Sequence, residues 1–312
     1  MKIRFLILLT AIILALSFSG CGNAPVSTTT KGPITVGSKV DTEGTLLAQI
    51  IILMLRDYGF TVNDRSATGQ TPIVRRALLN GEIDIYPEYT GNGAFFFNLA
   101  DSPVWQDFNA GYQKVKELDK TANNVIWLQP APANNTWAIA VTKTFADNNN
   151  LKTMDDLAAY INNGGVFKLA ASEEFLTSQV ALPAFEAAYG FSLRPDQQVV
   201  VSTGGTATTE KAAAEGTSGV NAAMAFGTDG DLAALGLLIL DDNRHAQPYY
   251  APAPIVRGVV FDKYPELATI LNPVFATLDL LTLQTLNAQI QVEGRGAAAV
   301  ARDYLKSKNF IP

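Results

Sequence analysis

Aromatic side chains lie at the ends of predicted strands or near the predicted crossings between two lobes, and aromatic rings can bind a cation that has no N–H group to donate. Water solvates a quaternary ammonium weakly, and the negative faces of Trp and Tyr attract it by up to about 2 kcal/mol per ring when water is excluded. In open α/β sheets, ligands bind beyond the carboxyl ends of the strands. Any one ring can equally be a core or rim residue, so their shared placement is what favours a cation-binding cleft. The rings in question are Tyr86, Tyr89, Trp137, Phe226, Tyr249 and Tyr250.

Groups suited to catalysis are scarce in this chain. It has one histidine, His245, and one cysteine, Cys21, which is too few for a typical zinc site. No G-x-S-x-G nucleophile motif, phosphate-binding P-loop or dinucleotide fingerprint is present. The acid pairs Glu173-Glu174 and Asp241-Asp242 have the chemistry for acid–base catalysis, but we expect them to be solvated loop charges. The sequence therefore predicts a binding protein that is not an enzyme and has no metal or other cofactor.

The composition limits the class of ligand. The 312 residues are 48% hydrophobic and 17% charged, which is enough for one large domain or two small ones. The formal net charge is -6, and the sequence has no cluster of Lys and Arg. An acidic surface of this kind is unsuited to nucleic acid or anionic lipid, so we expect no nucleic-acid partner. Small cations and zwitterions remain as candidate ligands.

The N-terminus has the pattern of an export signal. An apolar run from residue 5 to about residue 18 ends in Ser19-Gly20-Cys21. This run is shorter than the roughly 20 residues that a transmembrane helix needs. The segment resembles a bacterial lipobox, which predicts a signal peptide over 1–20, a lipidated Cys21 and a flexible tether over 21–32 rich in Ser, Thr, Pro and Gly. A simple secretory signal with an incidental cysteine is the alternative.

Apolar patterns with strand and helix periods alternate from Pro33 onward. This alternation predicts an α/β protein with right-handed βαβ units and mostly parallel sheets. Thr71 is the predicted N-cap of the second helix, and Gly81 is its predicted end. Strands are predicted at 34–37, 60–62, 83–86, 137–141, 166–170, 199–202 and 222–226, with an extended segment at 252–260. Helices are predicted at 46–58, 72–80, 154–162, 180–189, 208–214, 265–278, 283–292 and 297–306.

The order of these elements predicts two lobes. Lobe 1 is discontinuous and comprises residues 33–136 plus 249–312, whereas lobe 2 comprises residues 137–248. The chain crosses between the lobes near Trp137 and near Tyr249. A cleft between two lobes is a common site for a small molecule.

Short motifs then identify a family that the chain resembles. Together they resemble the substrate-binding proteins of osmoprotectant ABC importers, the glycine betaine/choline/carnitine group, and most closely the osmotically induced periplasmic branch. The resemblance extends from about Ile34 to the C-terminus and implies a type II periplasmic-binding fold whose lobes close on the ligand. The motifs are V-G-S-K from Val36, T-E from Thr42, G-E-I-D from Gly81, Y-P-E-Y-T-G from Tyr86, N-N-T-W-A from Asn134, F-G-T-D from Phe226 and Y-A-P-A-P from Tyr250.

The resemblance implies which rings form the ligand cage. The tyrosine of E-Y-T-G corresponds to Tyr89, and the aromatic residue after N-x-T corresponds to Trp137, where many members have Tyr. The aromatic residue before G-T-D corresponds to Phe226, which lacks the hydroxyl of the usual Tyr. Tyr250 precedes the proline-rich strand, and Tyr249 is its rival because the loop length is uncertain by one residue.

The resemblance also implies how the ligand carboxylate is held. Lys39 matches the lysine that reaches this carboxylate, and Asn92 stands where many relatives have a hydrogen-bonding Thr. Asn135 stands where some relatives have an acid. Many betaine binders also carry an Arg after the S-x-E-F segment, but here that position is Ser178. Loss of this bidentate clamp would weaken carboxylate recognition by several kcal/mol, because charge-assisted pairs are the strong ones.

The stretch Asp84–Gly93 shows what the sequence predicts in detail. Tyr89 is the ring expected in the cleft, and Glu88 is expected to be structural, fixing the turn or the hinge. Pro87 is expected to stop sheet pairing. Gly91 and Gly93 are expected to let the backbone turn close to a ligand.

The residues and the resemblance together predict an exported, lipid-anchored, monomeric binding protein. It would capture a quaternary-ammonium osmoprotectant of the glycine betaine, choline or carnitine class and deliver it to a separate ABC permease with its ATPase subunits. The predicted location is the periplasm or the outer face of the cytoplasmic membrane. The alternative keeps the fold but has weak betaine affinity, a different compatible solute or a role as a solute sensor. An exported enzyme that uses the paired carboxylates is the least favoured interpretation.

Overall fold

The computed structural model describes residues 31–202 and 205–312. The predicted signal peptide and Cys21 lie outside these residues, as does the tether up to residue 30. Residues 31 and 32, which were predicted as the end of the tether, already belong to strand β1 (Lys31–Gly37).

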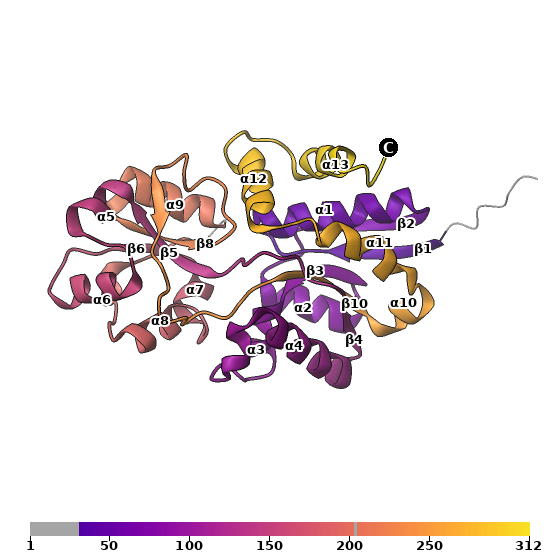
Figure 1. Cartoon of the computed structure of the whole chain (residues 1–312), viewed down its shortest axis with the longest axis horizontal. Coiled ribbons are helices and arrows are strands. Elements are labelled where there is room, and N and C mark those ends of the chain that lie inside the picture. The colour runs from indigo at the N-terminus through magenta and orange to yellow at the C-terminus, as the bar shows by residue number, and fades with distance from the viewer. Residues whose placement is uncertain (1–30, 203–204) are drawn as a thin grey trace, which may run out of the picture.

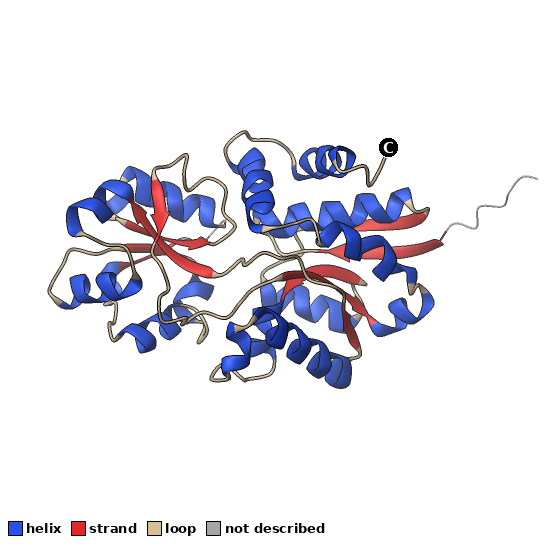
Figure 2. Cartoon of the chain, viewed as in Figure 1, coloured by secondary structure: helices blue, strands red, loops and turns tan. Residues whose placement is uncertain are grey.

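Two five-stranded mixed sheets form the framework, each covered by helices (Figures 1 and 2). The predicted α/β class is confirmed. In each sheet one strand, β10 or β5, runs antiparallel to both its neighbours, so the sheets are less parallel than the sequence predicted. The first sheet has the order β2 (Phe60–Arg65), β1, β3 (Ile85–Tyr89), β10 (Pro252–Arg257), β4 (Val125–Trp127). The second has the order β7 (Gln198–Val200), β6 (Leu169–Ala171), β8 (Ala222–Phe226), β5 (Trp137–Thr142), β9 (Leu237–Ile239).

Helices flank both sheets. Helix α6 and strand β8 have the predicted bounds, whereas α3, α4, α5, α7 and α10 were not predicted. The helices are α1 (Thr42–Asp57), α2 (Thr71–Asn80), α3 (Gly93–Phe96), α4 (Phe108–Asn123), α5 (Lys143–Asn149), α6 (Met154–Asn162), α7 (Glu173–Thr177), α8 (Leu182–Tyr189), α9 (Thr206–Glu215), α10 (Gly258–Lys263), α11 (Glu266–Phe275), α12 (Leu280–Gln291) and α13 (Ala297–Ser307).

The two helices that border the first sheet begin differently from the prediction. Helix α1 starts four residues before position 46 because Asp41 caps it, with its Oδ1 accepting from the Gly44 N–H at 2.6 Å. Helix α2 includes Thr71, and its N-cap is Gln70, which makes no capping hydrogen bond from its side chain. Gly81 ends α2 in the left-handed conformation, as predicted, with φ 77°.

Strand β3 continues through Pro87, which contradicts the prediction that this proline stops sheet pairing. Pro87 lies opposite Pro254 of the antiparallel neighbour β10. Neither residue has an N–H group to donate. Both fit here because directly opposite residues at a non-hydrogen-bonded position of an antiparallel ladder do not bond each other. The ladder therefore carries the chain on to Tyr89, which pairs with Pro252 at the end of the strand.

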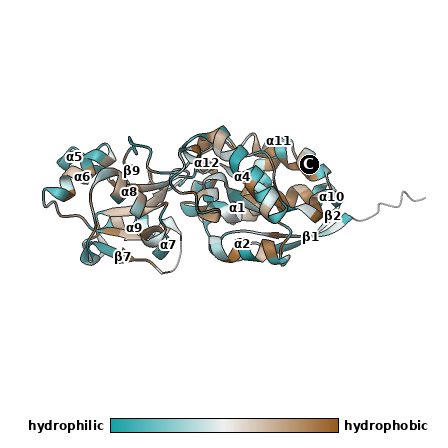
Figure 3. Ribbon diagram, turned by 90° about the horizontal axis from the view of Figure 1, so that it is seen from below, coloured by the Kyte–Doolittle hydropathy of each residue, from teal (hydrophilic) through white to brown (hydrophobic). Residues whose placement is uncertain are grey.

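Each sheet has its own hydrophobic core. Helix α1 is buried along most of its length between the first sheet and α11, α12 and α13. A separate core lies between the second sheet and the helices α6 and α8. Figure 3 shows the resulting two lobes joined at a narrow waist, where α12 lies.

Two chain segments cross the waist side by side. One joins β4 to β5, and the other joins β9 to β10. They are hydrogen-bonded to each other, since the Asn135 N–H donates to the Tyr250 carbonyl at 2.9 Å and the Tyr250 N–H donates to Asn134 Oδ1 at 2.8 Å. Within residues 31–202 and 205–312, no single helix is long and apolar enough to cross a membrane, although the bent pair α11 and α12 passes that test jointly.

Candidate functional site

A cavity lies between the two lobes. Its inner part has an open volume of about 50 Å³ and continues into an outer part of about 490 Å³. Because residues of both sheets line it, movement of one lobe against the other would change its size. Of the predicted site residues, all but Tyr249 line the inner part, namely Lys39, Tyr89, Asn92, Asn135, Trp137, Phe226 and Tyr250.

The wall of lobe 2 is a pair of neighbouring rings. Trp137 begins β5 and Phe226 ends β8, and the antiparallel register places them directly opposite each other. Their ring centroids are 4.6 Å apart with planes inclined at 39°. Phe175 packs against Trp137, with the ring centroids 5.3 Å apart. This arrangement follows from the strand pairing, since directly opposite side chains lie on the same face of a sheet.

The opposite wall comes from lobe 1 and from the second crossing segment. Tyr89 is at the end of β3 and is 4% exposed, and Tyr250 in the crossing segment is 3% exposed. Gly91 permits this placement because a Cβ there would be only 2.8 Å from the Tyr250 ring. Gly93 packs in the same way against Trp105, so both glycines make room for rings of the protein itself.

Tyr249 lies away from this cavity. Its ring packs edge-on against Phe108, with centroids 5.4 Å apart, and lines a different depression beside His245. Of the two rival tyrosines, the structure therefore brings only Tyr250 to the other cage residues.

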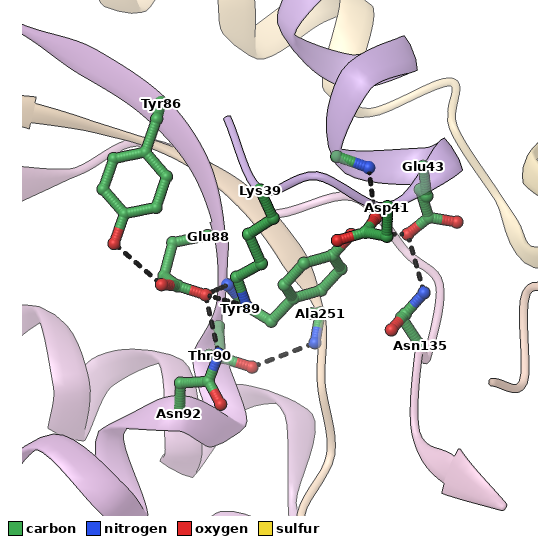
Figure 4. A network of polar contacts seen from close by, with 11 residues as sticks. Lys39, Asp41, Glu43, Tyr86, Glu88, Tyr89, Thr90, Asn92, Asn135 and Ala251 are labelled. Atoms are coloured by element: carbon green, nitrogen blue, oxygen red, sulfur yellow. Dashed lines mark hydrogen bonds and ion pairs between the residues drawn. The ribbon is translucent and has the colours of Figure 1, made fainter. Parts of the chain in front are cut away.

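Lys39 already places a cation on the aromatic wall (Figure 4). Its Nζ lies 4.7 Å from the centroid of the Tyr89 ring and 2.9 Å from Oε1 of Glu88. Glu88 is fully buried and also accepts hydrogen bonds from the Tyr86 hydroxyl, the Tyr89 N–H and Asn92 Nδ2. Glu88 thus has the structural role expected for it, and it fixes Lys39, Tyr89 and Asn92 together.

A second buried carboxylate, Glu43, stands behind Tyr89. Its Oε1 accepts from the Tyr89 hydroxyl and from Asn135 Nδ2, each at 3.0 Å, and its Oε2 accepts from Asn287 Nδ2 at 2.9 Å (Figure 4 shows the first two). Burial raises the pKa of Glu43 to about 7, while hydrogen bonds from Thr228 and Asn287 oppose this rise. The sequence pointed to this residue only through the T-E motif, without a role.

Glu174 was expected to be a solvated loop charge, and the structure contradicts this expectation. It lines both parts of the cavity, and burial raises the pKa of its carboxyl, against the opposing influence of the Lys39 charge. Its neighbour Glu173 is exposed, as expected. Ser178, which occupies the position of the family's arginine, ends α7 with its N–H donating to the Glu174 carbonyl, and it lines only the outer part.

Other lining residues were missed by the sequence reasoning. They are a mixture of polar, apolar and glycine residues, most of them in loops or at the starts of helices, so no pattern in the sequence set them apart. They are Val40, Asp41, Gln70, Thr71, Ser172, Gly205 and Met224.

The comparison with known families agrees with this geometry. Residues 32–307 match the model of the substrate-binding domain of ABC-type glycine betaine transport systems. The chain belongs to this family. Its members are substrate-binding proteins of transporters and not enzymes, which confirms the absence of catalytic function.

Individual relatives of the family give the same picture. The chain is 56% identical to the glycine betaine-binding protein YehZ of Escherichia coli K12 over 278 residues, covering 89% of this chain and 91% of that protein. It is 29% identical to a glycine betaine-binding protein of Pseudomonas aeruginosa, covering 88% of each. The structure of apo YehZ, at 55% identity, has a TM-score of 0.68 and covers 90% of this chain and 100% of that one.

More distant structures share the fold. A lactococcal OpuAC in a closed conformation complexed with glycine betaine has a TM-score of 0.60 at 14% identity, covering 89% of this chain and 97% of that one. The predicted two-lobed periplasmic-binding fold is therefore confirmed.

Proposed function

We propose that this family member captures a quaternary-ammonium solute of the glycine betaine class in the cage formed by Tyr89, Trp137, Phe226 and Tyr250. The observation that supports this most directly is that Lys39 rests its ammonium against Tyr89, so the wall is already a cation-binding surface. A methylated ammonium would use the same attraction, and it loses little hydration when it enters the cavity.

Recognition of the ligand carboxylate is the weaker half of the proposed site. Among the described lining residues, Lys39 is the one basic side chain, and Glu88 already neutralises it. A carboxylate would have to share Lys39 with Glu88, and Asn92 is itself bonded to Glu88. We infer that betaine is bound more weakly than in relatives that have the arginine missing at Ser178. Choline, carnitine or another methylated ammonium compound is therefore an additional candidate ligand.

We also propose that the protein is exported and works as a monomer, anchored through lipidated Cys21, with an ABC permease and its ATPase subunits. The family supports the transporter association. The short apolar run before the single cysteine supports the anchor.

A sensory role is the second candidate function. A relative of 24% identity from Halobacterium salinarum is named the substrate-binding protein CosB of a chemotactic signal transduction system, and it aligns with 89% of this chain and 84% of that protein. The two functions share the ligand site and differ in the partner protein that binds the closed, ligand-bound form. Loss of betaine uptake in a deletion strain favours the transporter, whereas loss of chemotaxis alone favours the sensor.

Calorimetric titration with glycine betaine, choline and carnitine tests the cage. Trp137→Ala removes one ring, and we expect roughly a 30-fold loss of affinity, which corresponds to about 2 kcal/mol. Tyr249→Ala is the matched control, because it removes a ring that belongs to the second crossing segment but does not line the cavity. The affinity of this variant is expected to equal that of the wild type. Full affinity in Trp137→Ala would contradict the cage, and nanomolar betaine binding by the wild type would contradict the weak-carboxylate inference.

A further inference from the structure

Glu43 lies behind the proposed cage and is not part of its lining. The residue is 4% exposed, and its carboxylate accepts a hydrogen bond from the hydroxyl of Tyr89, which lines the cavity. A ligand bound on the face of that ring would not touch Glu43, which lies at the hydroxyl edge of the ring. Any influence of Glu43 on the ligand therefore acts through the position and the electron density of Tyr89, and through space.

The partners of Glu43 come from different parts of the fold. Tyr89 belongs to β3 of lobe 1, Asn135 to the first crossing segment, and Asn287 to α12. Asn135 and Asn287 also bind Thr228, in the loop of lobe 2 that follows β8, through its hydroxyl and its carbonyl oxygen respectively. One carboxylate on α1 thus joins the ligand wall to the place where the lobes meet.

We propose that Glu43 is a positioning residue for ligand binding, in which the ionised carboxylate holds Tyr89 at the lobe junction and strengthens the attraction of the cage for a cation. This inference rests on the proposed function. A carboxylate that accepts a hydrogen bond from a phenol increases the negative charge on the ring, and a quaternary ammonium over that ring gains from it. The carboxylate also attracts the ligand directly through space.

The charged surroundings define the direction of the pH effect. The titratable groups that face Glu43 are Tyr89 and Asp41, with Lys39 and Glu88 beyond the Tyr89 ring, whereas Asn135, Thr228 and Asn287 are neutral. With a pKa of about 7, Glu43 is half-ionised in the free protein at neutral pH. A bound cation favours the ionised form, so affinity rises as pH rises through about 7, and binding near pH 7 releases a proton.

Titration of glycine betaine between pH 6 and pH 8.5 tests this inference, because the ammonium of betaine is fixed and its carboxylate stays ionised. We expect wild-type affinity to rise roughly tenfold across this range, as for two unit charges about 10 Å apart at an effective dielectric constant of about 20. Glu43→Gln keeps the shape but has no charge, so its affinity should stay near the acidic wild-type value at every pH. Glu117→Gln, the same change on the exposed face of α4, should follow the wild type.

A second measurement keeps the test independent of how well the Glu43→Gln variant folds. Calorimetry at pH 7 in buffers with different heats of ionisation counts the protons released on binding, and the wild type should release a fraction of one proton. Wild-type binding without proton release and without pH dependence overturns the inference but leaves the proposed function intact. A pH effect that persists in Glu43→Gln also overturns it, and points to another carboxyl near the cage. The candidates are Glu174, which lines the cavity and has a raised pKa, and Asp229, which accepts from the Phe226 N–H and has a pKa raised to about 6. No binding of betaine, choline or carnitine at any pH overturns the proposed function itself.

Discussion

At the scale of single residues, Glu43 lowers stability at neutral pH while it serves the ligand wall. Its carboxyl has a pKa of about 7 in the folded protein and an ordinary value near 4.5. Between these two pH values the folded state keeps a proton that the unfolded state has released. The free energy of unfolding therefore falls as pH rises from about 4.5 to about 7, by about 3 kcal/mol for this group.

Glu43→Gln should remove this part of the pH dependence. Urea unfolding of the ligand-free protein at pH 5 and pH 8 should show the wild type losing up to about 3 kcal/mol more than the variant across the interval. At pH 8 the variant should be at least as stable as the wild type, because burying a neutral amide costs less free energy than burying an ionised carboxylate. Parallel losses in the two proteins would show that Glu43 titrates normally.

Residue types and motifs predicted the cage, but they did not predict which neighbours surround it. Trp137 and Phe226 were predicted because one begins a strand and the other ends one, and strand register then made them partners. Tyr249 and Tyr250 were indistinguishable, because a loop has no period that tells which of two successive side chains points inward. Glu174 was misjudged because the burial of a carboxylate depends on the opposite lobe, about which its local sequence carries no information.

At the scale of elements, the loop after β8 and helix α12 act as one unit. Gln284 and Asn287 of α12 donate to the carbonyls of Gly227 and Thr228, and Gln291 accepts from the Gly230 N–H. A Cβ on Gly230 would be 2.2 Å from the backbone nitrogen of Ala288, so only glycine permits this approach. The same loop begins at Phe226, and α12 therefore helps to hold the cage wall of lobe 2.

Gly230→Ala should force the loop and α12 apart. The clash is with backbone atoms, so we expect a loss of about 2 kcal/mol in the free energy of unfolding and a weaker affinity for glycine betaine. Gly296→Ala is the matched control, since a Cβ there meets no atom within 4 Å. Urea unfolding and calorimetric titration measure the two effects. Equal behaviour of both variants would mean that the close contact with α12 is unimportant.

Element types were easier to predict than element ends. The regular apolar patterns of α6 and β8 gave the correct bounds, because each buries one continuous face against its own sheet. Strand β3 was predicted too short, because a proline ends pairing only if its neighbour offers a hydrogen-bonded position. The partner position here is Pro254, which lies 167 residues further along the chain (254 − 87) and cannot be inferred from the local pattern.

At the scale of the whole molecule, α12 spans a boundary that the sequence order does not reveal. By its place in the chain it follows the last strand of the first sheet, and α1 and α13 pack against it. Its contacts with the loop after β8 nevertheless belong to the second lobe. The hinge of the molecule therefore consists of two crossing segments and, beside them, a helical contact that must loosen if the lobes separate.

Asn287→Ala should weaken this contact without changing a residue that lines the cavity. Its side chain bonds Glu43 of α1 and the Thr228 carbonyl of lobe 2, so its loss frees lobe 2 to move away from α12. We expect the radius of gyration of the ligand-free variant, measured by small-angle X-ray scattering, to exceed that of the wild type and to return to the wild-type value with saturating ligand. Asn272→Ala is the matched control, because Asn272 accepts from the Gln129 N–H within lobe 1. Asn287→Ala also loses about 1 to 3 kcal/mol by leaving buried groups unpaired, whereas the Asn272 bond is exposed, so the radius of gyration and not the stability is the test of the hinge contact. An unchanged radius in Asn287→Ala would mean that the hydrogen bonds of Asn287 do not set the resting angle between the lobes.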